Sequence, residues 1–205
     1  CRIPTEVELA HEFRYRDPIV NEKTLIVALS QSGETMDTLM AVRHAREQGA
    51  KVISICNTHG STLPRESDAA LYTHAGPEIA VASTKAFLAQ ITAAYLLGLY
   101  LAQLRGNKYK DEISAILGEL QKMPAKIQKV IDNDTLVKEL GAEMKDTSSV
   151  IFLGRHVGFP VALEGALKLK EISYIHAEGF AAGELKHGPI CLLYTSPSPR
   201  DLSTS

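Results

Sequence analysis

The sequence has few cysteines and no long apolar run, and both absences narrow the kinds of protein it can be. Its three cysteines, Cys1, Cys56 and Cys191, form no close pair and no metal-ligand spacing, so reduced thiols in a cytosol are expected. The most apolar segment, residues 91–104, is interrupted by polar residues and is too short to span a bilayer comfortably. We therefore expect a buried helix there, no membrane association and a cytoplasmic location.

A strong charge of either sign is also missing. The formal net charge is -2 over 205 residues, which gives no reason to expect a nucleic-acid or anionic-membrane partner. The seven histidines are scattered, and no signal-peptide pattern is visible. With 45% hydrophobic and 22% charged residues, the composition is that of a soluble globular protein of one or two domains, without a metal or cofactor.

Strand-like and helix-like patterns alternate along the first hundred residues. This alternation predicts an α/β fold with a doubly wound parallel sheet. Ligands bind such sheets beyond the carboxyl ends of the strands. The expected strands are 7–13, 24–29, 51–56 and 69–73, and the expected helices are 35–48, ended by Gly49, and 84–104, with a polar loop from 57 through 64.

The second half begins with charged helical segments. Residues 109–147 are broken at Pro124 and at 132–134, which predicts linking helices with a solvated face. A new β-branched run at 149–153 precedes a helical pattern at 160–173. We expect a second sheet domain to begin here.

The turn at residues 30–35, SQSGET, joins the second expected strand to a helix start. Unpaired backbone N–H groups at a helix start attract phosphate, and Ser30, Ser32 and Thr35 add hydroxyl donors. The turn lacks the Gly-Lys-Ser/Thr ending of a nucleotide P-loop, so it suits a monosaccharide phosphate better than a triphosphate. An ordinary helix cap explains the same residue types.

Two further groups of residues have both a structural and a functional interpretation. Ser83 is well placed to cap the helix that follows it, which is the commoner role for such a serine. Glu164, Lys168 and Glu171 are spaced i, i+4 and i+7 on one helix face. That spacing is typical of an exposed ion-paired stripe, but it also suits an acid–base pair.

Several motifs carry a resemblance to a known family. The string SQSGETMDT resembles the phosphate loop of sugar isomerase (SIS) domains, which have a flavodoxin-like fold. Five other segments resemble the isomerase half of the glutamine:fructose-6-phosphate amidotransferase family, and they follow that family's order through nearly all of the first 190 residues. These segments are EFRYR (12–16), ICN (55–57), RESD (65–68), VASTKAF (81–87) and residues 162–189.

The resemblance implies an activity and roles for named residues. The family converts fructose 6-phosphate and glutamine-derived ammonia to glucosamine 6-phosphate. The resemblance assigns Glu171 to proton transfer between C1 and C2, Lys168 to assistance at the sugar oxygens, and His187, supplied by a neighbouring subunit, to ring opening. It therefore implies a homodimer. The residues that it places against the sugar phosphate are Ser30, Gln31, Ser32, Thr35, Val81 and Ser83.

Departures from the family set the expected domain boundaries. Residues 1–108 match a first SIS domain whose first strand and helix are missing, and 148–190 match the start of a second SIS domain. The glutaminase domain and the family's C-terminal lysine have no counterpart here.

A different SIS-type deaminase or deglycase, or a sugar-phosphate-sensing SIS regulator, would share the phosphate loop. Residues 191–205 depart from the family and read as a translated sequencing adaptor, so we expect them to have no structural role.

Overall fold

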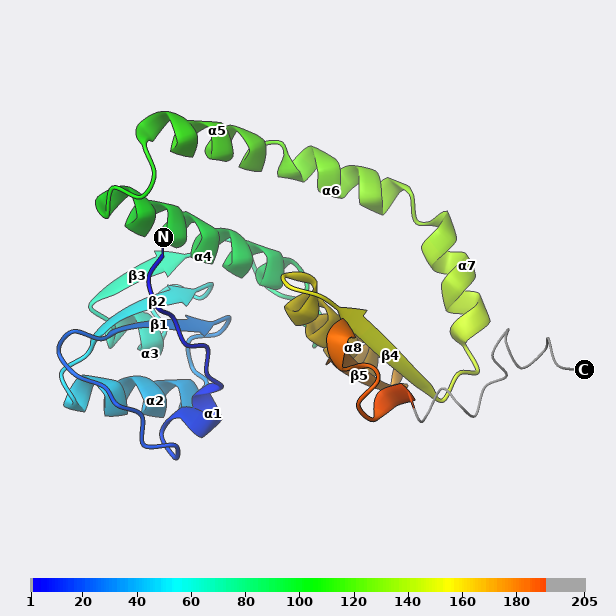
Figure 1. Cartoon of the computed structure of the whole chain (residues 1–205), viewed down its shortest axis with the longest axis horizontal. Coiled ribbons are helices and arrows are strands. Elements are labelled where there is room, and N and C mark those ends of the chain that lie inside the picture. The colour runs from blue at the N-terminus through cyan, green and yellow to red at the C-terminus, as the bar shows by residue number, and fades with distance from the viewer. Residues whose placement is uncertain (1, 191–205) are drawn as a thin grey trace, which may run out of the picture. The chain divides into compact units, whose positions relative to one another are not determined.

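The structure is a computed structural model that describes residues 2–190 (Figure 1). The chain divides into two compact units, Cys1–Ile127 and Gln128–Ser205, and each unit is described here by itself. The interpretation of 191–205 as an adaptor lies outside the described residues.

The first unit is built on a parallel three-stranded sheet in the order β1-β2-β3. β1 spans Leu25–Ser30, β2 Lys51–Cys56 and β3 Ala69–Tyr72. Ser30 pairs with Cys56, and Cys56 pairs with Tyr72, so the three strands end level with one another. Their carboxyl ends therefore form one edge, where loops from different strands meet.

Helices cover both faces of this sheet, which confirms the predicted α/β fold (Figure 1). α2 (Met36–Glu47) and the short α3 (Thr62–Arg65) pack on one face, and α4 (Lys85–Leu104) contacts β2 on the other. α5 (Lys110–Leu120) follows α4 and contacts it. Gly49, just after α2, has a φ of +92°, as expected for a glycine that ends a helix.

Apolar side chains from the sheet and from the helices on one of its faces make the core. Leu39 and Val42 of α2 pack with Val52 of β2 and Leu63 of α3, and all four are at most 3% exposed. Burial of each such side chain contributes roughly 1.5–3 kcal/mol to the free energy of folding. This packing holds α2 and α3 against β2, the strand that separates them in the sequence.

Helix α4 is predominantly apolar, with a few polar residues along it. Its length and mean hydropathy of 1.5 would suit a membrane span, a property that core helices of soluble proteins share. Among the described residues, Ala86, Leu99 and Ala102 of this helix are buried, whereas Ile91 and Tyr95 are about half exposed. The predicted helix is confirmed, and its burial is partial.

Two predictions about the first unit are wrong. The expected strand 7–13 is an irregular segment followed by the single-turn helix α1 (Ala10–Phe13). Val7 is 95% exposed, and alternating apolar residues form a strand only where a neighbour supplies hydrogen bonds and packing. The expected loop before Pro64 contains α3, because proline is tolerated in a first helical turn, where N–H groups have no partner.

The second unit contains a β-α-β arrangement. α6 (Met123–Asp132) crosses the boundary between the units, and α7 (Thr135–Met144) leads to β4 (Ser149–Gly154), α8 (Gly158–Ser173), β5 (His176–Ala181) and a 3-10 turn (Ala182–Glu184). β4 and β5 are parallel, with Gly154 opposite Ala181. β5 was not predicted, because His176–Ala181 has no β-branched residue.

The core of the first unit contains a buried hydroxyl without a hydrogen-bond partner among the described residues, that of Ser54. This side chain is wholly buried in β2, and its hydroxyl has no hydrogen-bond partner within residues 2–190. An unpaired buried hydroxyl is unfavourable. We predict that Ser54→Ala leaves the free energy of unfolding unchanged or raises it by up to about 1 kcal/mol, measured by urea denaturation.

Ser61 provides the matched control, since it is also buried but its hydroxyl donates to the Thr58 carbonyl at 2.7 Å. Ser61→Ala should lower the free energy of unfolding by about 1 kcal/mol. A larger loss in Ser54→Ala than in Ser61→Ala would show that the Ser54 hydroxyl is paired.

Candidate functional site: a hydroxyl-rich turn at the carboxyl edge of the sheet

The predicted phosphate turn lies between the end of β1 and the start of α2. At its centre, Gly33 has a φ of +69°. A Cβ there would lie 2.1 Å from Ser61 Oγ and 2.8 Å from Cys56 Sγ. Glycine is required on both counts, because an L side chain is strained at this φ and has no room. The turn is thereby packed directly against the segment that follows β2.

Two serines of the turn stabilise its shape. Ser30 Oγ accepts the Gly33 N–H at 2.9 Å, and Ser32 Oγ accepts the Glu34 N–H at 3.2 Å. Ser30 is 7% exposed, whereas Ser32 lies nearer the surface. Both bonds use the oxygen of the hydroxyl and leave its hydrogen to donate elsewhere.

The opposite side of the turn is tied to α3. The Gly33 carbonyl accepts the Leu63 N–H at 2.9 Å, and Glu34 Oε1 accepts the Thr62 N–H at 2.7 Å. The hydrogen bond from Thr62 lowers the pKa of the Glu34 carboxyl. These contacts fix the back of the turn and leave its front for a ligand.

The front of the turn is the N-terminus of α2. Thr35 is the N-cap residue, but its side chain makes no capping bond. The N–H groups of the first turn of a helix have no partner within the helix and carry a partial positive charge. Thr35 therefore does not act as an ordinary side-chain cap, and the interpretation of this turn as an anion site stays a prediction.

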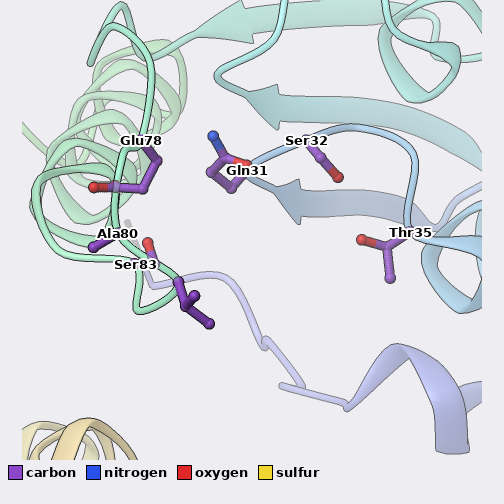
Figure 2. A pocket seen from close by; sticks show the side chains of 7 residues that line it. Gln31, Ser32, Thr35, Glu78, Ala80 and Ser83 are labelled. Atoms are coloured by element: carbon purple, nitrogen blue, oxygen red, sulfur yellow. The ribbon is translucent and has the colours of Figure 1, made fainter. Parts of the chain in front are cut away.

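An open cavity of about 360 Å³ lies in front of these groups. In Figure 2, the side chains of Gln31, Ser32 and Thr35 lie across from those of the loop that precedes α4. The residues that line the cavity are Gln31, Ser32, Thr35, Glu78, Ala80, Val81 and Ser83. The cavity thus gathers five of the six predicted substrate-binding residues, and the sixth, Ser30, supports the turn from beneath.

Glu78 was not predicted, and it explains how the second loop is held. Its carboxylate accepts the Thr84 N–H at 3.4 Å, the Thr84 hydroxyl at 3.1 Å and the Ala86 N–H at 3.2 Å. Glu78 therefore serves as the cap of α4, the role predicted for Ser83, while Thr84 is the N-cap residue and makes no capping bond itself. No sequence rule places a capping side chain six residues before the N-cap residue, so the spacing of Glu78 and Thr84 did not indicate this role.

The ionisation of Glu78 reflects two opposing effects. Partial burial works against its charged form, but the hydrogen bonds from Ala86 and Thr84 outweigh burial and lower the pKa of the carboxyl below its ordinary 4.5. The charged form thus fits its surroundings better than the neutral form.

The predicted acid–base residues lie on α8 in the second unit. Lys168 Nζ is 2.5 Å from Glu171 Oε2 and 3.5 Å from Glu164 Oε1. The three side chains are 21–33% exposed, so they lie in a half-buried position and not on a fully solvated face. Burial opposes the charge on Lys168, but the Glu171 hydrogen bond and the Glu164 charge prevail, and the pKa of the ammonium is raised.

His187 lies elsewhere in the second unit. Its backbone N–H donates to the Glu184 carbonyl at 2.8 Å, and its side chain is exposed. Across residues 2–190, no hydrogen bond or ion pair joins His187 to Glu171 or Lys168. No group of three or more potential metal ligands occurs in the same part of the chain.

Comparison with known families identifies the family of the chain. The SIS domain model matches residues 2–100 and 143–195. The chain belongs to the SIS domain family. The match includes both the phosphate turn of the first unit and helix α8 of the second.

Individual SIS proteins narrow the comparison. The chain is 79% identical to the glutamine–fructose-6-phosphate aminotransferase (isomerizing) of Corynebacterium efficiens, over 98% of this chain and 33% of that protein. It therefore spans about a third of the length of the curated relatives that it matches. The match to the Streptomyces coelicolor enzyme of the same name is 63% identical and covers 98% of this chain and 34% of that protein.

Solved SIS structures agree with the fold. The C-terminal domain of glucosamine-fructose-6-phosphate aminotransferase from Francisella tularensis has a TM-score of 0.90 and 45% identity, covering 93% of this chain and 54% of that one. Glucosamine-6-phosphate deaminase from Thermotoga maritima has a TM-score of 0.63 and 27% identity, covering 89% and 54%.

The contacts of Glu78 predict a pH-dependent order at the start of α4. Since its folded pKa is lowered, its contribution is fully present above the ordinary pKa of 4.5 and is lost as the pH falls through the folded value. Glu78→Gln should therefore reduce protection of the Thr84 and Ala86 amides from hydrogen exchange at pH 7, and the difference from wild type should vanish in acid.

The control is Glu139→Gln, an exposed residue of α7, which should leave both amides unchanged. Equal protection in wild type and Glu78→Gln at pH 7 would show that Glu78 does not hold the loop.

Proposed function

We propose that this chain is the sugar-phosphate isomerase portion of a glutamine–fructose-6-phosphate aminotransferase. Such an enzyme converts fructose 6-phosphate and ammonia from glutamine to glucosamine 6-phosphate, the precursor of UDP-N-acetylglucosamine. The observation that carries the proposal is the cavity in front of the α2 N-terminus, lined by residues from both the phosphate turn and the loop before α4. The identity to relatives of that name supports it.

The phosphate of the sugar binds at the phosphate turn. Backbone N–H groups at the start of α2 and the hydroxyls of Ser32 and Thr35 donate to it, while Ser30 holds the turn in shape from beneath. No lysine or arginine lines the cavity, so the helix terminus supplies the positive potential. Gln31 lies beside these donors and contacts the sugar.

Glu78 sets the direction in which the ligand lies. Glu78 lies on the opposite wall of the cavity from Thr35, with its carboxylate toward the start of α4 (Figure 2), and two negative groups repel each other. The phosphate therefore occupies the α2 side, and the sugar hydroxyls extend toward Ser83 and the backbone of Val81.

The residues on α8 perform the proton transfer. Isomerisation between C1 and C2 needs a carboxylate that removes a proton from one carbon and returns it to the next. Glu171 is that base, and Lys168, in contact with it, supplies a cation for the developing charge on the sugar oxygen. His187 opens the sugar ring from a neighbouring subunit, so the working site belongs to a homodimer.

The similarity to relatives of that name supports the rest of the proposed assembly. A glutaminase domain delivers ammonia, the enzyme is cytoplasmic, the isomerisation uses no cofactor, and residues 148–190 begin a second SIS domain. The similarity to the Thermotoga deaminase favours a sugar-phosphate deaminase as the second candidate, with the same phosphate turn and without a glutaminase.

The acid–base proposal predicts a specific loss of turnover in Glu171→Gln. The amide keeps the shape of the side chain but is not a base, so isomerisation should fall by about 10²–10⁴-fold with sugar-phosphate affinity near wild type. The measurement is exchange of the C2 hydrogen of glucosamine 6-phosphate with solvent, in an enzyme of the relatives' full length.

Glu143→Gln, an exposed substitution on α7, controls for the change of charge. If Glu171 only forms a surface ion pair with Lys168, its replacement changes stability by about 0.3–0.5 kcal/mol and leaves exchange intact. Wild-type exchange in folded Glu171→Gln would remove this residue from the mechanism.

A further inference from the structure

Both walls of the cavity are attached to one residue that does not itself line it. Asn57 is the first residue after β2, at the level edge where the three strands end. Its backbone contacts the phosphate turn, and its side chain contacts the segment that leads to the second loop. The two sets of bonds use different atoms, so they can be separated by substitution.

The backbone of Asn57 holds the phosphate turn. Its N–H donates to the Gln31 carbonyl at 3.2 Å, and the hydroxyl of Thr58 donates to the same carbonyl at 3.3 Å. Since any residue at position 57 except proline has this N–H, the bond to Gln31 persists when the side chain is changed.

The side chain of Asn57 holds the segment after β3. Oδ1 accepts the Thr73 hydroxyl and the Ala75 N–H, both at 2.9 Å, and Nδ2 donates to the Gly76 carbonyl at 2.8 Å. The backbone partners fix the orientation of the amide, because a carbonyl needs a donor and an N–H needs an acceptor. Only a side chain with both functions on one short stem satisfies this arrangement.

The residues held by Asn57 begin the second loop. Gly76 has a φ of +71°, so the chain turns sharply there, two residues before Glu78. The loop then supplies Ala80, Val81 and Ser83 to the cavity, and Glu78 holds its far end against α4. Asn57 and Glu78 therefore hold the two ends of the loop.

We propose that Asn57 is a positioning residue that sets the 75–83 loop against the phosphate turn and thereby determines affinity for the sugar part of the ligand. This inference rests on the proposed function, since it names the sugar as the group that the loop contacts. Asn57 does not touch the reacting atoms, and it acts through the placement of Val81 and Ser83.

Asn57→Asp separates the two roles with little change of shape. A carboxylate still accepts from Thr73 and Ala75, but it presents an oxygen to the Gly76 carbonyl where the amide donated. One hydrogen bond becomes a repulsion between two acceptors, and the loop shifts. The phosphate turn keeps its bond from the backbone of residue 57.

The test compares two ligands in the full-length enzyme. Inorganic phosphate probes the turn alone, and fructose 6-phosphate probes the turn and the loop together. In Asn57→Asp, we expect the dissociation constant of inorganic phosphate to stay within about twofold of wild type, while the KM for fructose 6-phosphate rises roughly tenfold and kcat changes less. Asn133→Asp, an exposed residue with the same change of charge, should alter neither.

Each other outcome has a distinct meaning. An unchanged KM for fructose 6-phosphate in folded Asn57→Asp, or an equal loss for both ligands, overturns the positioning role. Wild-type enzyme that binds neither ligand overturns the proposed function itself. If Asn57→Asp does not fold, Thr73→Val removes one bond to Oδ1 and should raise the KM by about threefold with phosphate affinity intact, and an unchanged KM there overturns the inference.

Discussion

The close contact of Gly33 with the segment after β2 is the constraint on which the candidate site depends. A left-handed residue without a side chain lets the turn lie against Ser61 and Cys56. The Leu63 N–H then donates to the Gly33 carbonyl, and the Thr62 N–H donates to the Glu34 carboxylate. With the back of the turn satisfied in this way, the donors at the start of α2 face the cavity. The proposed anion site would be a consequence of how the turn is packed from behind.

The level ends of the three strands place this turn at one wall of a cavity. β1 supplies the phosphate turn, β2 supplies Asn57, and β3 leads to the second loop. A cavity forms between two loops that are far apart in sequence, with hydroxyls and helix N–H groups on one wall and the Glu78 carboxylate on the other. The two walls therefore differ in charge, and no lysine is among the residues that line the cavity.

The sequence predicted those elements whose formation depends on residues close to one another in the chain. The β-branched run Lys51–Cys56 and the turn with its helix start at Thr35 were found where expected, because each signal lies within a few residues. The strand expected at 7–13 failed because pairing depends on a neighbour, and β5 was missed because its pairing with β4 outweighs its weak β-propensity. The side-chain hydrogen bonds of Asn57 and Glu78 join residues 6 to 19 positions apart, and spacing along the sequence does not reveal them.

The central claim is that the N-terminus of α2 binds the phosphate of a sugar phosphate, and amide NMR tests it most directly. Titration of the ¹⁵N-labelled protein with fructose 6-phosphate should produce saturable shifts that are largest for the amides of Ser32, Thr35 and Met36, and inorganic phosphate should reproduce them. The second loop should respond to the sugar phosphate alone. Saturable shifts centred on another part of the chain, with the amides of residues 31–37 unmoved, would contradict the account.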